Sequence, residues 1–100
     1  MKEEKERYIK IADFMTGKLG LKGTGLLVFA VIYGFDAAGN YFTGGEKYLS
    51  KVINASEKSV RRALKKLLEN GFIRVSSLED VNLGKAVYSI KPGVGVFSPA

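Results

Sequence analysis

The strongest constraint on the fold is a run of eight consecutive apolar residues, Leu26 to Tyr33. The run is too short to span a bilayer, and it must be buried as a strand of an internal sheet or as an internal helix. Periodicity does not separate these two structures. Because the central helix of a compact bundle is buried all round, and because Gly34 is well placed to stop a helix, we predict a helix that ends at Gly34.

Length and composition indicate one ordinary globular domain. The chain has 100 residues, of which 46% are hydrophobic and 26% are charged, and this suffices for a single core. Without cysteine it has no disulfide and no thiolate nucleophile, and without histidine it lacks the commonest general base. The ten acidic residues are scattered, so we expect neither an enzyme active site nor a cofactor. The first residues mix both charge signs, which is untypical of a signal peptide, and we expect a cytoplasmic protein.

The charge balance favours an acidic partner. Sixteen basic and ten acidic residues give a formal net charge of +6. Such a surplus favours nucleic acid or an anionic surface, although many basic proteins bind neither. The distribution of the charges is therefore more informative than their total.

The segments on either side of the apolar run give shorter signals. Residues 8–21 suit either an extended arm or a helical turn, and both structures stay open. Residues 36–40 contain turn formers, and the two aromatic residues after them suit a short bridge of a sheet. Thr43 and Glu46 have the T-x-x-E spacing of a capping box, which predicts the start of a short helix that ends before Asn54.

A longer helix is predicted over residues 57–69. Ser56 is a natural N-cap, because its hydroxyl can accept from the exposed N–H groups of the first turn. Gly71 is placed to adopt the left-handed conformation that follows many helices. The apolar residues recur at the spacing of a core-facing stripe: Val60, Ala63, Leu64, Leu67 and Leu68.

After this helix the period changes from helical to alternating. Residues 72–77 and 85–91 are predicted strands, and polar turn formers and Gly84 lie between them. The predicted order is helix, brief strand, short helix, tight turn, longer helix and hairpin. This is the order of an α+β winged helix-turn-helix, which has a three-helix core and a C-terminal β-hairpin as its wing.

The winged helix-turn-helix domain is expected to cover residues 8–91. A charged lead-in at residues 1–7 precedes it, and a tail at residues 92–100 follows it. Pro92 and Gly93 end the second predicted strand.

The outer face of the 57–69 helix is basic and suits double-stranded DNA. Because the first turns of a recognition helix enter the major groove, base contacts are expected from Lys58, Ser59, Arg61 and Arg62. Backbone contacts are expected from other parts of this surface: Thr43, Lys47, Lys51, Lys65, Lys66, Arg74 and Lys85. For Thr43 a plain helix cap is the simpler interpretation. The alternative for the whole face is a solvated surface, because Glu57–Arg61 and Lys65–Glu69 have the i,i+4 spacing of ion pairs.

The predicted wing tip is less suited to DNA. Residues 77–84 include Glu79 and Asp80 and no basic residue, which weakens a role in the minor groove. The apolar residues of the same loop suit contact with another protein instead. The second hypothesis is therefore a winged helix that serves protein–protein interaction or oligomerisation, for example in a homodimer.

Two segments resemble the N-terminal winged-helix domain of phage replisome-organiser and DnaD-like replication proteins of Gram-positive bacteria and their mobile elements. They are LGLKGTGLLVFAVIYGF at 19–35 and YFTGGEKYLSKVINASEKSVRRALKKLLENGFI at 41–73. Their most specific parts are L-L-V-F-A-x-I-Y before a Gly-rich loop and S-x-x-S-V-x-x-A-L-x-x-L-x-x-x-G-x-I.

The resemblance covers about residues 8–91 and implies DNA binding in replication initiation or in transcriptional regulation of a phage or mobile element. It also implies that such a domain can oligomerise through its N-terminal segment and wing. Larger members of that family carry a further C-terminal domain, so the chain is expected to be either a trimmed domain or a small stand-alone protein.

Overall fold

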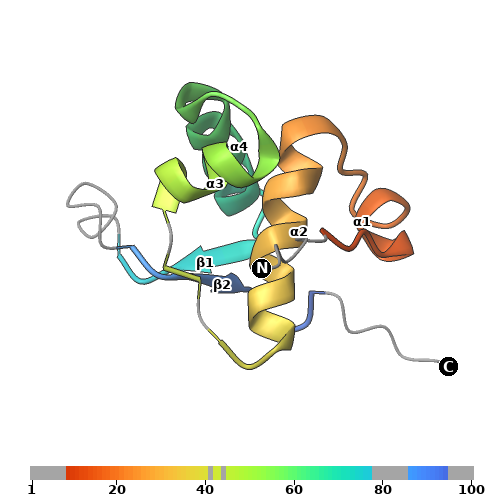
Figure 1. Cartoon of the computed structure of the whole chain (residues 1–100). Coiled ribbons are helices and arrows are strands. Elements are labelled where there is room, and N and C mark those ends of the chain that lie inside the picture. The colour runs from red at the N-terminus through yellow and green to blue at the C-terminus, as the bar shows by residue number, and fades with distance from the viewer. Residues whose placement is uncertain (1–8, 41, 44, 78–85, 95–100) are drawn as a thin grey trace, which may run out of the picture.

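The computed structural model describes residues 9–40, 42–43, 45–77 and 86–94. Within them the chain is an α+β domain with four helices and a two-stranded antiparallel hairpin (Figure 1). The elements are α1 (Asp13–Thr16), α2 (Gly23–Ala37), α3 (Gly45–Ile53), α4 (Glu57–Glu69), β1 (Ile73–Val75) and β2 (Tyr88–Ile90). The predicted α+β class is confirmed. In the described part of the chain, none of these helices is long and apolar enough to cross a bilayer.

The apolar run forms the central helix, α2. Its five consecutive residues 28–32 are all buried, because α1, α3, α4 and β2 pack around it. In Figure 1, α1 lies on one side of α2, and α3, α4 and the hairpin lie on the other. The prediction of a helix rather than a strand is confirmed.

The predicted stop of this helix at Gly34 is wrong. The helix continues to Ala37, and the amide of Ala38 still donates to the carbonyl of Gly34 at 3.2 Å. Gly39 is the residue with a left-handed backbone, at φ 83°. A glycine inside a helix weakens it without ending it, whereas a glycine at positive φ ends it.

The N-terminal arm, which the sequence left undecided between an extended arm and a helical turn, forms the single turn α1. Met15 is 1% exposed in the core. The ring of Phe14 meets the rings of Phe29 and Tyr33 edge-on, at centroid distances of 6.1 and 5.2 Å. The arm therefore covers the side of α2 that the other helices leave open.

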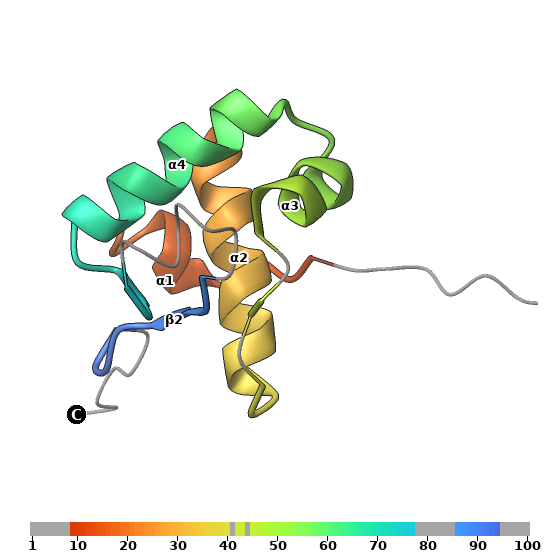
Figure 2. The same cartoon turned by 90° about the vertical axis from the view of Figure 1, so that its left-hand side faces the viewer.

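The tight connection between α3 and α4 follows the predictions. α3 ends at Ile53, and Asn54 takes a left-handed backbone at φ 58°. The Ser56 hydroxyl accepts a hydrogen bond from the amide of Ser59 at 3.0 Å, so the N-cap of α4 is confirmed. Gly71, at φ 76°, follows the end of α4 as expected. Figure 2 shows α4 lying across the N-terminal half of α2.

The predicted capping box at the start of α3 is wrong. α3 begins at Gly45, which makes Glu46 its second residue instead of the third that a capping box requires. The carboxylate of Glu46 accepts hydrogen bonds from Arg61 of α4. A partner 15 positions away in the sequence has thus replaced the local one.

The hairpin is shorter than the predicted strands and is anchored by one aromatic residue. Ile73 pairs with Ile90, and Val75 pairs with Tyr88. Phe42 forms an isolated bridge to Tyr88: its amide donates to the Tyr88 carbonyl at 3.2 Å, and its carbonyl accepts from the Tyr88 amide at 2.9 Å. The predicted brief strand before α3 is therefore this bridge. Residues 78–84 of the predicted wing tip, and Lys85, lie outside the described residues.

Candidate nucleic-acid interface

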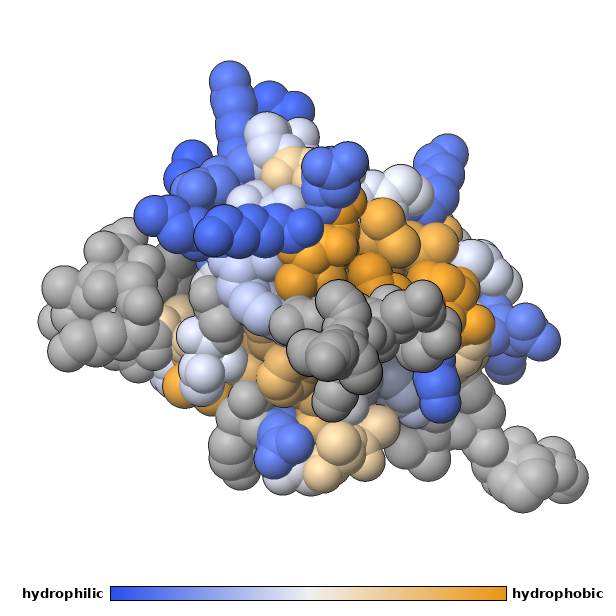
Figure 3. Space-filling view, viewed as in Figure 1, coloured by the Kyte–Doolittle hydropathy of each residue, from blue (hydrophilic) through white to orange (hydrophobic). Residues whose placement is uncertain are grey.

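Helix α4 separates an apolar inner face from a basic outer face. Four apolar residues of the inner face are buried in the core: Val60, Ala63, Leu64 and Leu67. Five basic residues of the outer face are exposed: Lys58, Arg61, Arg62, Lys65 and Lys66. In Figure 3 hydrophilic side chains gather over α3 and α4, and hydrophobic side chains are exposed over α2. Burial of the inner face fixes the rotation of α4, so its basic face must point outward.

Most of the cations on α4 are unneutralised. Lys58, Arg62, Lys65 and Lys66 have no ion-pair partner among the residues that the structure describes. Neither i,i+4 pair that the sequence offered, Glu57–Arg61 or Lys65–Glu69, forms an ion pair there. The charge of Glu57 still attracts Arg61, but the carboxylate that contacts Arg61 is that of Glu46.

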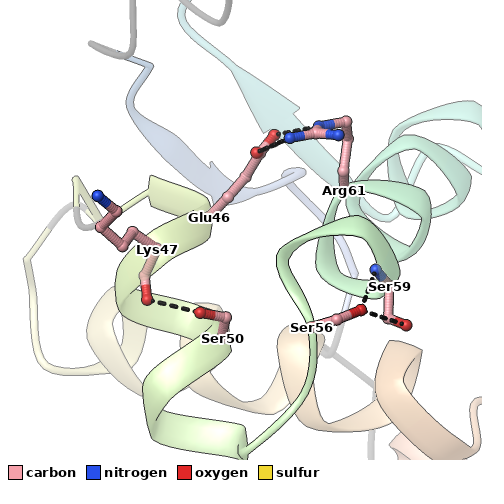
Figure 4. A network of polar contacts seen from close by, with 6 residues as sticks. All are labelled: Glu46, Lys47, Ser50, Ser56, Ser59 and Arg61. Carbon is pink, nitrogen blue, oxygen red and sulfur yellow. Dashed lines mark hydrogen bonds and ion pairs between the residues drawn. The ribbon is translucent and has the colours of Figure 1, made fainter.

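Arg61 is the exception, because Glu46 of α3 binds it (Figure 4). Its Nε donates to both carboxylate oxygens at 3.2 and 3.3 Å, and its Nη2 donates to Oε1 at 3.0 Å. These hydrogen bonds, followed by the charge attraction of Glu46, raise the pKa of Arg61 above its ordinary value. The Arg61 side chain remains 62% exposed, against 24% for Glu46. Arg61 thus carries its charge in a fixed position at the α3 edge of the basic face.

Ser59, predicted to contact bases, has a local partner. The Ser56 hydroxyl donates to the Ser59 hydroxyl at 3.0 Å while it accepts from the Ser59 amide (Figure 4). The side chain of Ser59 is half-buried at the start of α4. Its hydroxyl oxygen therefore takes part in the cap at the start of α4.

A hollow lies on the other edge of α4, against the start of α2. Arg62 and Lys66 line it from α4, and Lys22 and Thr24 line it from α2. Lys22 is the N-cap of α2, its side chain makes no capping hydrogen bond, and the first turn of α2 has no acidic residue. Three cations thus gather where no described carboxylate neutralises them.

Sequence reasoning missed Lys22 and Thr24. The only local sequence signal at these two residues is K-G-T-G at 22–25, just before the apolar run, and this pattern is typical of a turn. Its importance depends on α4 crossing the start of α2, which no local pattern reveals. The sequence therefore shows these residues but not that they lie beside α4.

The remaining predicted contacts lie on other elements. Thr43 is exposed just before α3, and Lys47 and Lys51 are exposed on α3 itself. The Lys47 side chain has no described ion-pair partner, and its carbonyl accepts from the Ser50 hydroxyl at 2.9 Å (Figure 4). Arg74 is exposed on β1. The structure therefore places exposed basic residues on α3, α4 and β1.

Across the described ranges, no group of three acidic residues could hold a metal ion. Tyr88 is the second group with a displaced pKa: burial, and to a lesser degree the charge of Glu46, raises its pKa. A buried tyrosine with a raised pKa is no better an acid at neutral pH, so its environment gives no sign of catalysis.

The strongest chemical feature of the described surface is therefore a convex basic helix edged by further cations. Comparison of the chain with known protein families, curated proteins and solved structures gives no significant match.

Proposed function

We propose that this domain is a winged helix-turn-helix that binds double-stranded DNA with α4 in the major groove. The observation that carries the proposal is the outer face of α4, where four exposed cations have no described partner. A solubilising helix surface commonly interleaves both signs as i,i+4 pairs, and this face does not form them. The order of α2, α3, α4 and the hairpin supports the winged helix-turn-helix.

The two edges of α4 suit the two phosphate backbones that border a major groove. A helix in the groove lies between the strands, so side chains on its edges face phosphates while its centre faces bases. The edge next to α2 has Lys22 and Lys66 beside the hollow. Beyond the edge next to α3 are Lys47 and Lys51, exposed on that helix. Lys58, Arg61 and Arg62 lie in the first two turns of α4, which enter the groove and face bases, and Lys65 lies farther along the helix.

The resemblance to phage replisome-organiser and DnaD-like replication proteins supports a narrower form of the proposal. In that form the domain acts in replication initiation or in transcriptional regulation of a phage or mobile element. It needs no catalytic group, since binding and positioning on DNA are the whole activity.

An apolar groove favours a second candidate function, contact with another protein. It runs between the N-terminal arm, α2 and α3, and it is lined by Ile9, Met15, Tyr33, Tyr48 and Val52, among others. Apolar grooves of this kind serve protein interfaces. Binding there would depend little on salt, whereas binding to phosphates depends strongly on it.

The test is binding to a fluorescent mixed-sequence duplex by anisotropy at low salt. Arg62→Ala/Lys66→Ala removes two cations of α4 that have no described ion-pair partner. Lys10→Ala/Lys91→Ala is the matched control and removes two exposed lysines that lie outside the helices and strands. We expect the first variant to lose at least about tenfold in affinity and the control to lose much less. Equal losses would assign binding to net charge alone, and absence of wild-type binding would leave the protein-contact function.

A further inference from the structure

The contact between Arg61 and Glu46 uses one edge of the guanidinium group and leaves another free. The side edge, made of Nε–H and one Nη2–H, points at the carboxylate of Glu46. An arginine has five N–H donors. Of the three that remain, one N–H of Nη1 and the second N–H of Nη2 point the same way and form the end edge.

The end edge is a donor pair that can bridge the N7 and O6 atoms of guanine. The Arg61 side chain is 62% exposed at the edge of the basic face, so a ligand can reach it. A bidentate contact requires the guanidinium plane to match the plane of the base. A carboxylate bound to the side edge constrains that plane before any ligand arrives.

We propose that Glu46 is a positioning residue that orients Arg61 to read one guanine of the DNA target. The inference rests on the proposed function of α4. Glu46 suits this role because it lies in the first turn of α3, whereas Arg61 lies on α4, and because its side chain is only 24% exposed. The orientation of Arg61 is therefore set by the packing of α3 on α4.

Glu46 has a second, opposite effect on binding. Its negative charge lies at the edge of the basic face, where it repels phosphates of every sequence equally. Glu46 therefore lowers affinity in general while it raises the selectivity of Arg61. The two effects are separable, because only the second depends on the base and on the presence of Arg61.

The test begins with selection of preferred sites from random duplexes by the wild-type chain. Affinities are then measured for the selected site and for sites in which each guanine is replaced. The variants are Glu46→Ala, Arg61→Ala and their combination. Glu69→Ala is the matched control, because Glu69 is an exposed carboxylate of α4 without a described ion-pair partner.

We expect Arg61→Ala to lower discrimination at one guanine by about tenfold, and Glu46→Ala to lower it at the same guanine by about threefold or more. In the Arg61→Ala background Glu46→Ala should have no further effect on discrimination. Glu69→Ala should raise affinity for all sites without changing their order. The double variant separates positioning from a general structural effect of Glu46, which would persist without Arg61.

Three results would overturn the inference. Glu46→Ala could strengthen binding to all sites equally, which would make Glu46 only a repulsive or restraining charge. The wild type could bind duplexes without any guanine preference, in which case the proposed DNA binding stands and the positioning role fails. Absence of any duplex binding would end both proposals together.

Discussion

Replacement of Phe42 by alanine tests how the hairpin is attached to the helices. Phe42 is 1% exposed and forms the only bridge between the segment before α3 and β2 within the described residues. Its ring lies 5.2 Å from that of Phe35, 5.7 Å from Tyr48 and 6.4 Å from Tyr88. Truncation removes all three ring contacts and leaves a cavity where the hairpin meets α2 and α3.

The expected loss is large for a domain of this size. Phe→Ala changes in cores cost about 3–5 kcal/mol, and a domain of 100 residues is stable by only about 5–15 kcal/mol. Urea unfolding followed by circular dichroism measures the difference. Phe42→Leu is the control, because it keeps most of the apolar volume and should cost roughly 1–2 kcal/mol. A loss below about 1 kcal/mol for Phe42→Ala would refute the burial of this ring and the attachment built on it.

Three further substitutions test local features. Because burial raises the pKa of Tyr88, the unfolded chain releases this proton first as pH rises, so stability is complete below about pH 10 and falls above it. Urea unfolding between about pH 9.5 and pH 11.5 measures this decline, and Tyr88→Phe should lack the part that comes from Tyr88. Parallel curves for the two chains would contradict the assignment. Gly34→Ala should raise the free energy of unfolding by about 0.5–1 kcal/mol, because Gly34 is helical and a Cβ there meets nothing within 4 Å. Gly71→Ala should lower the free energy of unfolding by about 1–2 kcal/mol, because the φ of Gly71 is +76°. Equal effects of the two substitutions would be inconsistent with these backbone conformations.

The features that the sequence predicted correctly are those with local causes. The bounds of α4 follow from a serine cap, a regular apolar stripe and a glycine after the last turn, all within 16 residues. The burial of α2 follows from eight apolar residues in a row, which no exposed element tolerates.

The features that it missed depend on contacts between distant segments. Glu46 was assigned to a capping box by its distance from Thr43, but Arg61 offers its carboxylate a charged partner across the α3–α4 packing. Lys22 joins the basic surface only because α4 crosses the start of α2. The helix was predicted to end at Gly34 because the sequence does not show the backbone angle of a glycine. A glycine ends a helix where φ is positive, as at Gly39, and only weakens it where φ is helical, as at Gly34.

The salt dependence of duplex binding tests the central claim most directly. The salt slope counts phosphate contacts, and four of them are proposed, from Lys22, Lys66, Lys47 and Lys51. Four phosphate contacts give a log–log slope of about −3.6, or about a 150-fold loss of affinity between 50 and 200 mM salt. Arg62→Ala/Lys66→Ala removes one of these phosphate contacts, that of Lys66, and should reduce the slope to about −2.7 while circular dichroism shows an unchanged fold. An unchanged slope in this variant, or wild-type binding that is insensitive to salt, would contradict the placement of DNA on α4.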